Sequence, residues 1–372
     1  SSPPLLSATL KPPGYVSSPG AGSRDSRAAV EQLSALVGTF DKPQFFDYDP
    51  DRCAHGRNGV TACTRCIDAC PAQAIRGHGE GVEIDPYLCQ GGGVCASVCP
   101  SGAIRYAYPR PGDLGKRIRA ILKSYREAGG RDPVLVFHAE GHPPDEWLES
   151  CSNLLPVAVE EVASVGPEIW LLSLAFGARR VFLMDEQSEP EQVRVGLGGQ
   201  LEMIGEILAA MGYPAAAVSR VGAGGSAEPE EGAMPSMVPA VHAVMEDKRG
   251  NFYLALDHLH ARAVKSKTMV NLSAGDAFGA VFVEPKACTL CMACVSVCPG
   301  NALQGGGGEP RLGFLEANCI QCGLCTRTCP EDAIWITPRL LFDREYRNTP
   351  RVLHQEEPFC CVTCGKPVSY TH

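Results

Sequence analysis

Two blocks of regularly spaced cysteines constrain this chain more than any other feature of its sequence. Residues 288–299 read CTLCMACVSVCP and residues 319–330 read CIQCGLCTRTCP, so each matches C-x2-C-x2-C-x3-C-P without a fault. Three thiolates on a tight loop can face one compact metal cluster, whereas the fourth cysteine, at the start of a short helix, points to the opposite side. Proline then turns the chain, because it has no backbone N–H to donate.

This spacing is the two-cluster bacterial ferredoxin pattern, in which the fourth cysteine of each half binds the cluster of the other half. The second block therefore predicts two 4Fe-4S sites. We assign them to set 3 (Cys288, Cys291, Cys294 and Cys329) and set 4 (Cys298, Cys319, Cys322 and Cys325). Zinc ribbons also use C-x2-C pairs, but without a third cysteine two residues on and a fourth ahead of proline, so zinc ranks far below iron–sulfur here.

The first block, from residue 53 to residue 99, follows the same plan with two departures. Nine residues rather than two separate Cys53 from Cys63. A loop of that length closes at small additional entropy cost, so we expect Cys53 to reach the cluster, the alternative being that it is a bystander. The crossed rule then gives set 1 (Cys53, Cys63, Cys66 and Cys99) and set 2 (Cys70, Cys89 and Cys95).

The second departure is Gly92, which stands where set 2 should have its fourth cysteine. Three outcomes are open: a 3Fe-4S core, a 4Fe-4S core whose last iron takes solvent or a non-cysteine side chain, or an empty site. We rank the empty site last, because three correctly spaced thiolates remain. The prediction is a cluster that loses or exchanges one iron more readily than the other three.

The segment between the blocks has a different pattern. Residues 113–130 have apolar side chains at helical spacing and end in paired glycines, and the apolar run PVLVFH at 133–138 is of strand type. Alternating strand and helix patterns follow, with long helical stretches at 190–212 and 250–263, and they predict a small parallel sheet covered by helices. The expected fold class is thus two copies of an α+β two-cluster ferredoxin-like domain flanking a small parallel α/β domain.

The expected domain boundaries follow from these patterns. A Pro/Gly/Ser-rich linker with a short helix occupies 1–44, ferredoxin-like domain I 45–110, the α/β insert 111–268, ferredoxin-like domain II 269–340, and a tail 341–372. In the tail, Cys361 and Cys364 have the spacing of half a zinc-ribbon site. Cys360, His354 and His372 are conceivable helpers, although the other half is expected beyond residue 372. Cys151 stands alone and is expected to be a packing or surface residue.

Composition excludes some partners and settings. The net charge of −9 argues against a nucleic-acid partner, since phosphate binding needs clustered Lys and Arg. No run of about 18 apolar residues predicts a membrane span, and no secretory signal is visible, so a cytoplasmic location is expected. Grouped cysteines in that setting indicate metal ligands rather than disulfides.

The order of ferredoxin block, insert, ferredoxin block and cysteine tail resembles large 4Fe-4S proteins that accompany formate dehydrogenases. Its layout is similar to that of heterodisulfide reductase and its hydrogenase partner. The insert resembles the delta subunit of the methyl-viologen-reducing hydrogenase over ASVGPEIWLLSLAFGARRVFLMD at 163–185, without that subunit's cysteine pattern. The resemblance implies redox partners of formate dehydrogenase or hydrogenase type, a further ferredoxin domain before residue 1 and a second zinc-type knuckle after residue 372.

Three functions are compatible with these features. The first is an electron relay, an electron-transfer subunit of an oxidoreductase complex rather than a stand-alone enzyme, passing single electrons through three to four 4Fe-4S clusters, with a 3Fe-4S cluster as the alternative at set 2. The second is an enzyme that uses the incompletely ligated iron of set 2 as an open site. The third is a structural adaptor folded by its clusters. We favour the relay.

Overall fold

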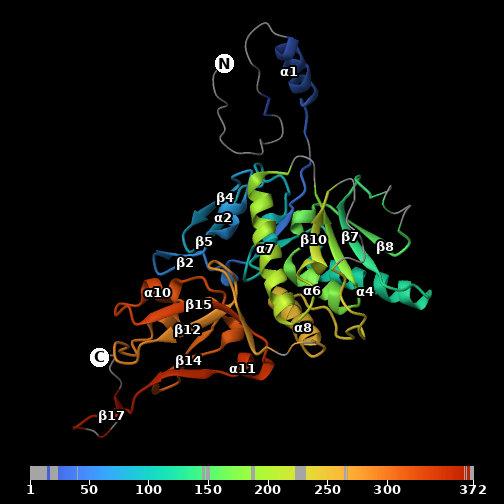
Figure 1. Ribbon diagram of the computed structural model, residues 1–372. Coiled ribbons are helices and arrows are strands. Elements are labelled where there is room, and N and C mark those ends of the chain that lie inside the picture. Colours follow the sequence, from blue (N-terminus) through green and yellow to red (C-terminus); the bar gives the residue numbers. More distant parts are fainter. Residues whose placement is uncertain are drawn as a thin grey trace.

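The computed structural model describes residues 15–16, 24–39, 41–144, 147, 151–185, 189–222, 232–263, 265, 267–363, 365 and 367–368. Figure 1 shows three packed parts: a small cysteine-bearing part in blue, a sheet with helices in green and yellow, and a second cysteine-bearing part in orange and red. Helix α1 (Arg24–Ala35) projects away from them. Within the described ranges, no helix has the length and apolar character that crossing a membrane requires.

Short antiparallel strand pairs build the first cysteine-bearing part. The pairs are β1 (Phe46–Tyr48) with β6 (Ile104–Tyr106), β2 (Gly56–Arg57) with β3 (Val60–Thr61), and β4 (Ile75–His78) with β5 (Gly81–Ile84). A turn, η1 (Pro50–Arg52), and two short helices, α2 (Arg65–Ala69) and α3 (Val94–Ser97), connect them. The β1–β6 pair joins the two ends of this part, so the cysteine loops between them are held as one unit.

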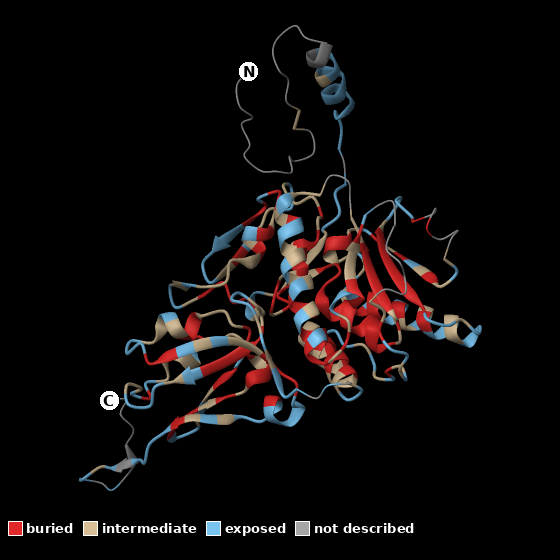
Figure 2. Ribbon diagram, in the orientation of Figure 1, coloured by how far each residue is buried: buried red, intermediate tan, exposed pale blue. Residues whose placement is uncertain are grey.

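A four-stranded parallel sheet forms the middle part. Its strands lie in the order β10 (Val218–Val221), β9 (Arg180–Met184), β7 (Val134–Ala139), β8 (Leu154–Val159). Helices α4 (Pro111–Glu127), α6 (Pro167–Ala175), α7 (Glu191–Ala210) and α8 (Lys248–His260) pack with it, as do the short turns η2 (Val162–Ser164) and η3 (Ala215–Ala217). The first five residues of β7 and all nine of α6 are buried, as expected for a parallel sheet covered on its faces. Figure 2 shows this part as the main concentration of buried residues.

The long helices predicted in the insert are present at the expected places. Helix α4 covers most of 113–130, starting earlier because Pro111 suits the first helical position and ending before Gly129, whose φ of +88° is left-handed. Helices α7 and α8 correspond to the stretches predicted at 190–212 and 250–263. In α4 the amphipathic spacing and the terminal residues agree, whereas α8 begins after Asp247, whose side chain accepts from the Gly250 amide.

Two three-stranded antiparallel sheets form the second cysteine-bearing part. One has the order β11 (Met269–Asn271), β15 (Ile334–Leu341), β12 (Gly279–Val283), and the other β13 (Leu303–Gly306), β14 (Glu309–Phe314), β16 (Arg351–Gln355). The helical segments are α9 (Ala293–Ser296), η4 (Glu316–Asn318), α10 (Leu324–Thr328) and α11 (Arg344–Asn348). Beyond them, β17 (Phe359–Cys360) pairs with β18 (Pro367–Val368).

The second part extends past the expected boundary at residue 340. That boundary falls inside β15, and β16 adds a strand to the edge of β14. The buried carboxylate of Glu316 binds Arg339 of β15 at 2.8 Å and Arg351 of β16 at 2.5 Å, which fastens both strands to the same turn. Residues 341–355 therefore belong with the second cysteine-bearing part, because its sheet and ion pairs need them.

Candidate metal centres

Three of the four cysteines of set 1 lie in one buried core, and the fourth, Cys63, is partly buried. Cys53, Cys66 and Cys99 are 8%, 9% and 7% exposed. Burial raises the pKa of Cys66, and the neighbouring Cys99, Cys95, Cys63 and Cys53 raise it further, so these sulfurs lie close together. Thiols in such surroundings ionise readily only when a metal takes up the thiolate charge.

The nine-residue spacer between Cys53 and Cys63 folds into a hairpin that returns the chain to the cluster site. Strands β2 and β3 form the hairpin, and at its base the Cys63 amide donates to the Ala54 carbonyl at 3.2 Å. Cys53 and Cys63 are thereby brought side by side in spite of their separation in sequence. Burial first, and then Cys99 and Cys53 among its neighbours, raise the pKa of Cys63, in keeping with the expectation that Cys53 is a ligand.

Set 2 surrounds a small cavity of about 30 Å³. Cys70, Cys89, Cys95 and the backbone at Gly92 line it, together with apolar and aromatic side chains. Burial raises the pKa of Cys95 to about 12, with additional contributions from Cys70, Cys89 and Cys99. The donors present are therefore three thiolates converging on a space without a fourth.

Gly92 leaves open space where a side chain would stand. A Cβ at Gly92 would have no heavy atom within 4 Å, and the backbone there is not left-handed. Its neighbours differ. A Cβ at Gly91 would meet the Phe45 ring at 2.8 Å, a Cβ at Gly93 would meet Ser164 at 2.5 Å, and both glycines have positive φ. Of the three glycines, only Gly92 can accept a side chain without strain.

Set 3 is the most solvent-accessible of the four. Cys288, Cys291, Cys294 and Cys329 line a cavity of about 20 Å³, and Cys291 is exposed. Burial raises the pKa of Cys294 to about 12, and the nearby Cys288, Cys291 and Cys329 raise it further. The spacing prediction and the structure thus bring the same four sulfurs together.

Set 4 is more enclosed. Cys319 and Cys325 are 7% and 9% exposed. Burial raises the pKa of Cys325, followed by the effects of Cys319, Cys322 and Cys298. The Gln321 side chain donates to the Cys319 sulfur at 3.3 Å. Hydrogen bonds to ligand sulfur raise the potential of a cluster, so Gln321 belongs to the electrostatic surroundings of set 4.

The same turn follows each C-P pair, a signal that the cysteine spacing alone did not reveal. The sequences are CPAQA, CPSGA, CPGNA and CPEDA, and the fourth residue of each has a positive φ: Gln73, Gly102, Asn301 and Asp332. In three of them the alanine amide donates to the sulfur of the cysteine, namely Ala74 to Cys70, Ala302 to Cys298 and Ala333 to Cys329, at 3.3–3.4 Å. The repeated alanine marks a sulfur-binding turn.

Sets 1 and 4 face each other across the junction of the two cysteine-bearing parts. Burial raises the pKa of Cys322 to about 12. The nearby Cys319 and Cys298 raise it further, and so does Cys63 of the first cysteine-bearing part. Helix α10 lies against β3, where the Arg327 guanidinium donates to the Thr61 carbonyl at 2.5 Å. The junction therefore places ligand loops of the two parts in direct contact.

The burial of the fifteen predicted ligands follows the same division. Each buried ligand belongs to set 1 or set 4: Cys53, Cys66, Cys99, Cys319 and Cys325. The ligands of sets 2 and 3 are all partly or fully accessible. Sets 1 and 4 are thus the inner pair, and sets 2 and 3 the outer pair.

The donor sets fit clusters better than single ions. Around one tetrahedral zinc the sulfurs are only about 3.8 Å apart, as Zn–S bonds of about 2.3 Å require. Among the residues that the structure describes, no group of three or more His, Cys, Asp or Glu could hold such an ion. The cysteine spacing and the apolar surroundings of the sulfurs suit an iron–sulfur core. The half zinc site expected in the tail is not tested, because Cys364 lies outside the described residues.

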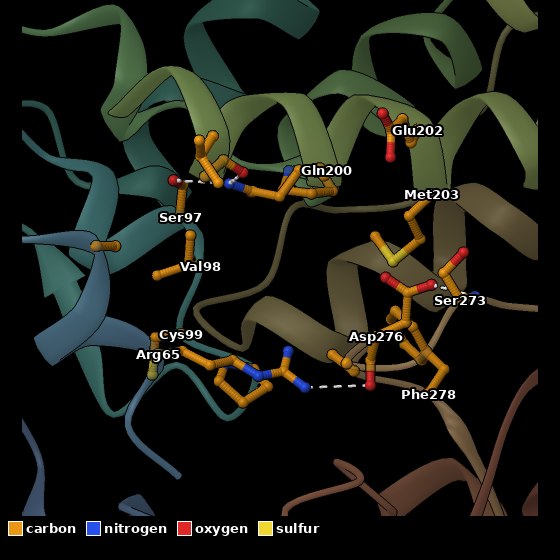
Figure 3. Close-up of a pocket in the computed structure, with 18 of the residues that line it drawn as sticks. Arg65, Ser97, Val98, Cys99, Gln200, Glu202, Met203, Ser273, Asp276 and Phe278 are labelled. Carbon is orange, nitrogen blue, oxygen red and sulfur yellow. Dashed lines mark hydrogen bonds between the residues drawn. The ribbon is translucent and has the colours of Figure 1, made fainter. Parts of the chain in front are cut away.

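A large cavity of about 600 Å³ borders set 1 at Cys99. Figure 3 shows it beneath α7, which contributes Gln200 and Met203, with Arg65 and Cys99 on one side and Asp276 and Phe278 on the other. Arg65 donates to the Asp276 carbonyl at 3.1 Å across it. The cavity thus lies where all three parts of the molecule meet.

Glu168 is a buried acid at this cavity and makes the stability of the protein dependent on pH. It is 3% exposed, and burial raises its pKa although Lys248, 3.9 Å away, lowers it. In the unfolded chain the Glu168 carboxyl loses its proton at the ordinary pKa of about 4.3, and in the folded chain it does so at a higher pH. The free energy of unfolding therefore falls as the pH rises from the unfolded pKa to the folded one. We expect Glu168→Gln to flatten that fall in the thermal midpoint of the holoprotein.

The control for this prediction is Glu202→Gln, which changes an exposed carboxylate at the same cavity. It should leave the pH dependence of the midpoint as it is in the unmodified protein. Equal slopes for Glu168→Gln and the unmodified protein would contradict the assignment.

Comparison with known proteins agrees with the cysteine geometry. The family described as the 4Fe-4S dicluster domain matches the chain twice, over residues 61–103 and 287–333. The ferredoxin-type protein NapF of Escherichia coli K12 is 44% identical over 45 residues, which are 12% of this chain and 27% of that protein; NapF of E. coli O157:H7 matches equally. The matching region spans about a quarter of the length of these curated relatives. The two matches thus support a protein that contains 4Fe-4S ferredoxin domains.

Proposed function

We propose that this protein relays single electrons through a linear series of clusters in the order set 2, set 1, set 4, set 3. The contact between Cys63 and Cys322 loops at the junction carries the proposal, because it makes sets 1 and 4 neighbours. Within each part, the crossed ligands tie the two sets together through α2 and α3 in one part and α9 and α10 in the other. This order keeps each set next to a neighbour with which its ligand segments are in contact.

The burial of the ligands supports the same order. A relay needs inner clusters that are shielded from solvent and outer clusters that partners can reach. Sets 1 and 4 contain the buried cysteines, whereas Cys291 of set 3 is exposed and the ligands of set 2 are partly accessible. Electrons would enter at one outer set and leave at the other.

The proposed partners are other redox proteins, of the formate dehydrogenase or hydrogenase type that the resemblance implies, in the cytoplasm. Catalysis at the open iron of set 2 is the weaker alternative. Among the described residues that line the cavity at set 2, none is an Asp, Glu, His, Lys or Arg that could act as a catalytic acid or base beside a cluster.

The test is an anaerobic redox titration of the reconstituted protein, with iron and sulfide analysis and EPR at each potential. We expect reversible one-electron couples from up to four clusters, and a magnetic interaction between the reduced clusters of sets 1 and 4. Clusters that cannot be reduced reversibly would overturn the relay in favour of the adaptor. A spectrum that changes only on adding a substrate would favour the enzyme.

A further inference from the structure

Three consecutive residues at the start of α8 contact three different cluster-bearing segments. They are Asp247, Lys248 and Arg249, which belong to the middle part and are not themselves near-neighbours of any cysteine in sequence. Asp247 contacts Arg52, the residue before Cys53. Lys248 contacts α3 at Ala96, between Cys95 and Cys99, and Arg249 contacts the backbone of Cys319. Sets 1, 2 and 4 are therefore all within reach of one short segment.

Lys248 binds the end of the helix that connects sets 1 and 2. Its ammonium donates to the carbonyls of Ala96 and Ser97 at 2.8 and 2.6 Å. These residues lie between Cys95, assigned to set 2, and Cys99, assigned to set 1. The Lys248 side chain is 16% exposed, so solvent ions screen its charge only weakly.

Arg249 binds backbone carbonyls next to set 4, as Lys248 does next to sets 1 and 2. Its guanidinium donates to the carbonyl of Cys319 at 3.0 Å and to that of Ala317 at 3.0 and 3.3 Å. It also donates to the Ala277 carbonyl at 3.1 Å and lies 4.6 Å from the centre of the Phe278 ring. Several contacts fix the guanidinium in one place, so its charge stays beside Cys319.

Asp247 holds this segment to the first cysteine-bearing part. Its carboxylate caps α8 by accepting from the Gly250 amide at 2.6 Å and forms an ion pair with Arg52, the residue before Cys53. The three side chains thus place one anion toward the Cys53 loop and two cations toward the other ligand segments.

We infer that Asp247, Lys248 and Arg249 are positioning residues for electron transfer across the junction, holding sets 1 and 4 in register and setting their reduction potentials through fixed charges. The inference rests on the proposed relay. A cluster becomes more negative on reduction, so a nearby fixed cation stabilises the reduced form and raises the potential, whereas a fixed anion lowers it. In support, the Arg249 guanidinium donates to the Cys319 carbonyl at 3.0 Å, so its charge lies beside a ligand of set 4.

The test compares the potentials of the clusters in neutral and charge-keeping variants by EPR-monitored titration. Lys248→Met should lower the potentials of sets 1 and 2 and leave that of set 3. Arg249→Met should lower the potential of set 4, whereas Arg249→Lys should stay close to the unmodified protein. Asp247→Asn keeps a helix cap but leaves Arg52 without its counter-charge, so it should raise the potential of set 1. Structural damage alone would not produce shifts of opposite sign.

The control is Lys123→Met, which removes an exposed cation on α4 that pairs with Glu127. It should shift no potential. Unchanged potentials in the Met variants would overturn the inference, as would equal shifts in Arg249→Met and Arg249→Lys. If a Met variant loses iron, Asp247→Asn decides by the sign of its shift, and an absent or downward shift counts against the inference. A failed relay is a separate result, because these potentials can be measured whether or not electrons pass between the parts.

Discussion

Replacing both Cys322 and Cys325 with alanine should stop electrons from passing between the two ferredoxin parts. Both side chains belong to set 4, and the two remaining ligands, Cys298 and Cys319, are too few to hold a cubane. The iron content should fall by about a quarter if four clusters are present. In the proposed order set 4 lies between sets 1 and 3, so its loss would leave set 3 without a neighbouring cluster across the junction.

Transfer across the junction can be measured with a light-driven electron donor attached to the exposed tail. A thiol-reactive ruthenium label at Cys360, with Cys151, Cys361 and Cys364 changed to serine, introduces electrons near the second part. Rapid-freeze EPR then follows which clusters become reduced. In the labelled parent chain all sets should be reduced in turn, and in the double-alanine chain sets 1 and 2 should stay oxidised. Equal reduction of set 1 in both chains would refute the linear order.

Gly92→Cys should convert set 2 into a fully ligated 4Fe-4S cluster, and it should add about one iron atom per chain where the parent holds a three-iron core. The new side chain has open space, since no heavy atom lies within 4 Å of a Cβ at this position. The EPR signal of an oxidised three-iron cluster, if the parent protein shows it, should disappear in the variant. The cluster should also resist loss of iron to a chelator for longer.

Gly93→Ala is the matched control for this variant. Its Cβ would lie 2.5 Å from Ser164, and its φ of +68° is unfavourable for alanine. It should therefore weaken set 2, whereas Gly92→Cys strengthens it. The same iron content and spectrum in Gly92→Cys and the parent would show that set 2 already has a fourth ligand.

The sequence was sufficient to group the cysteines, because the cluster chemistry fixes their spacing. It also located the long helices, and in α4 the amphipathic spacing coincides with Pro111 at the start and Gly129 after the end. The fate of Cys53 needed the structure, since only the β2–β3 hairpin shows how the nine-residue spacer returns to Cys63. The extension of the second part to β16 was missed, because the strand Arg351–Gln355 has no cysteine and gains its meaning only from pairing with β14.

The relation between the two ferredoxin parts could not be predicted from the sequence. It depends on contacts such as that between Arg327 and Thr61, which are 266 residues apart. Lys248 and Arg249 likewise look like ordinary polar residues at the start of a helix. Their roles appear only when the fold brings three distant loops to the same helix end.

The accessible position of set 3 has a consequence for how oxygen would damage this protein. Oxygen and peroxide attack clusters that they can reach, and Cys291 offers them the most open ligand of the four sets. Damage would therefore begin at set 3, at one end of the proposed relay, and leave sets 1 and 4 intact. A molecule that has lost the set 3 cluster would still accept electrons on its other clusters but could not pass them to a partner at set 3. Electron transfer would therefore be lost at one end while the fold stayed intact.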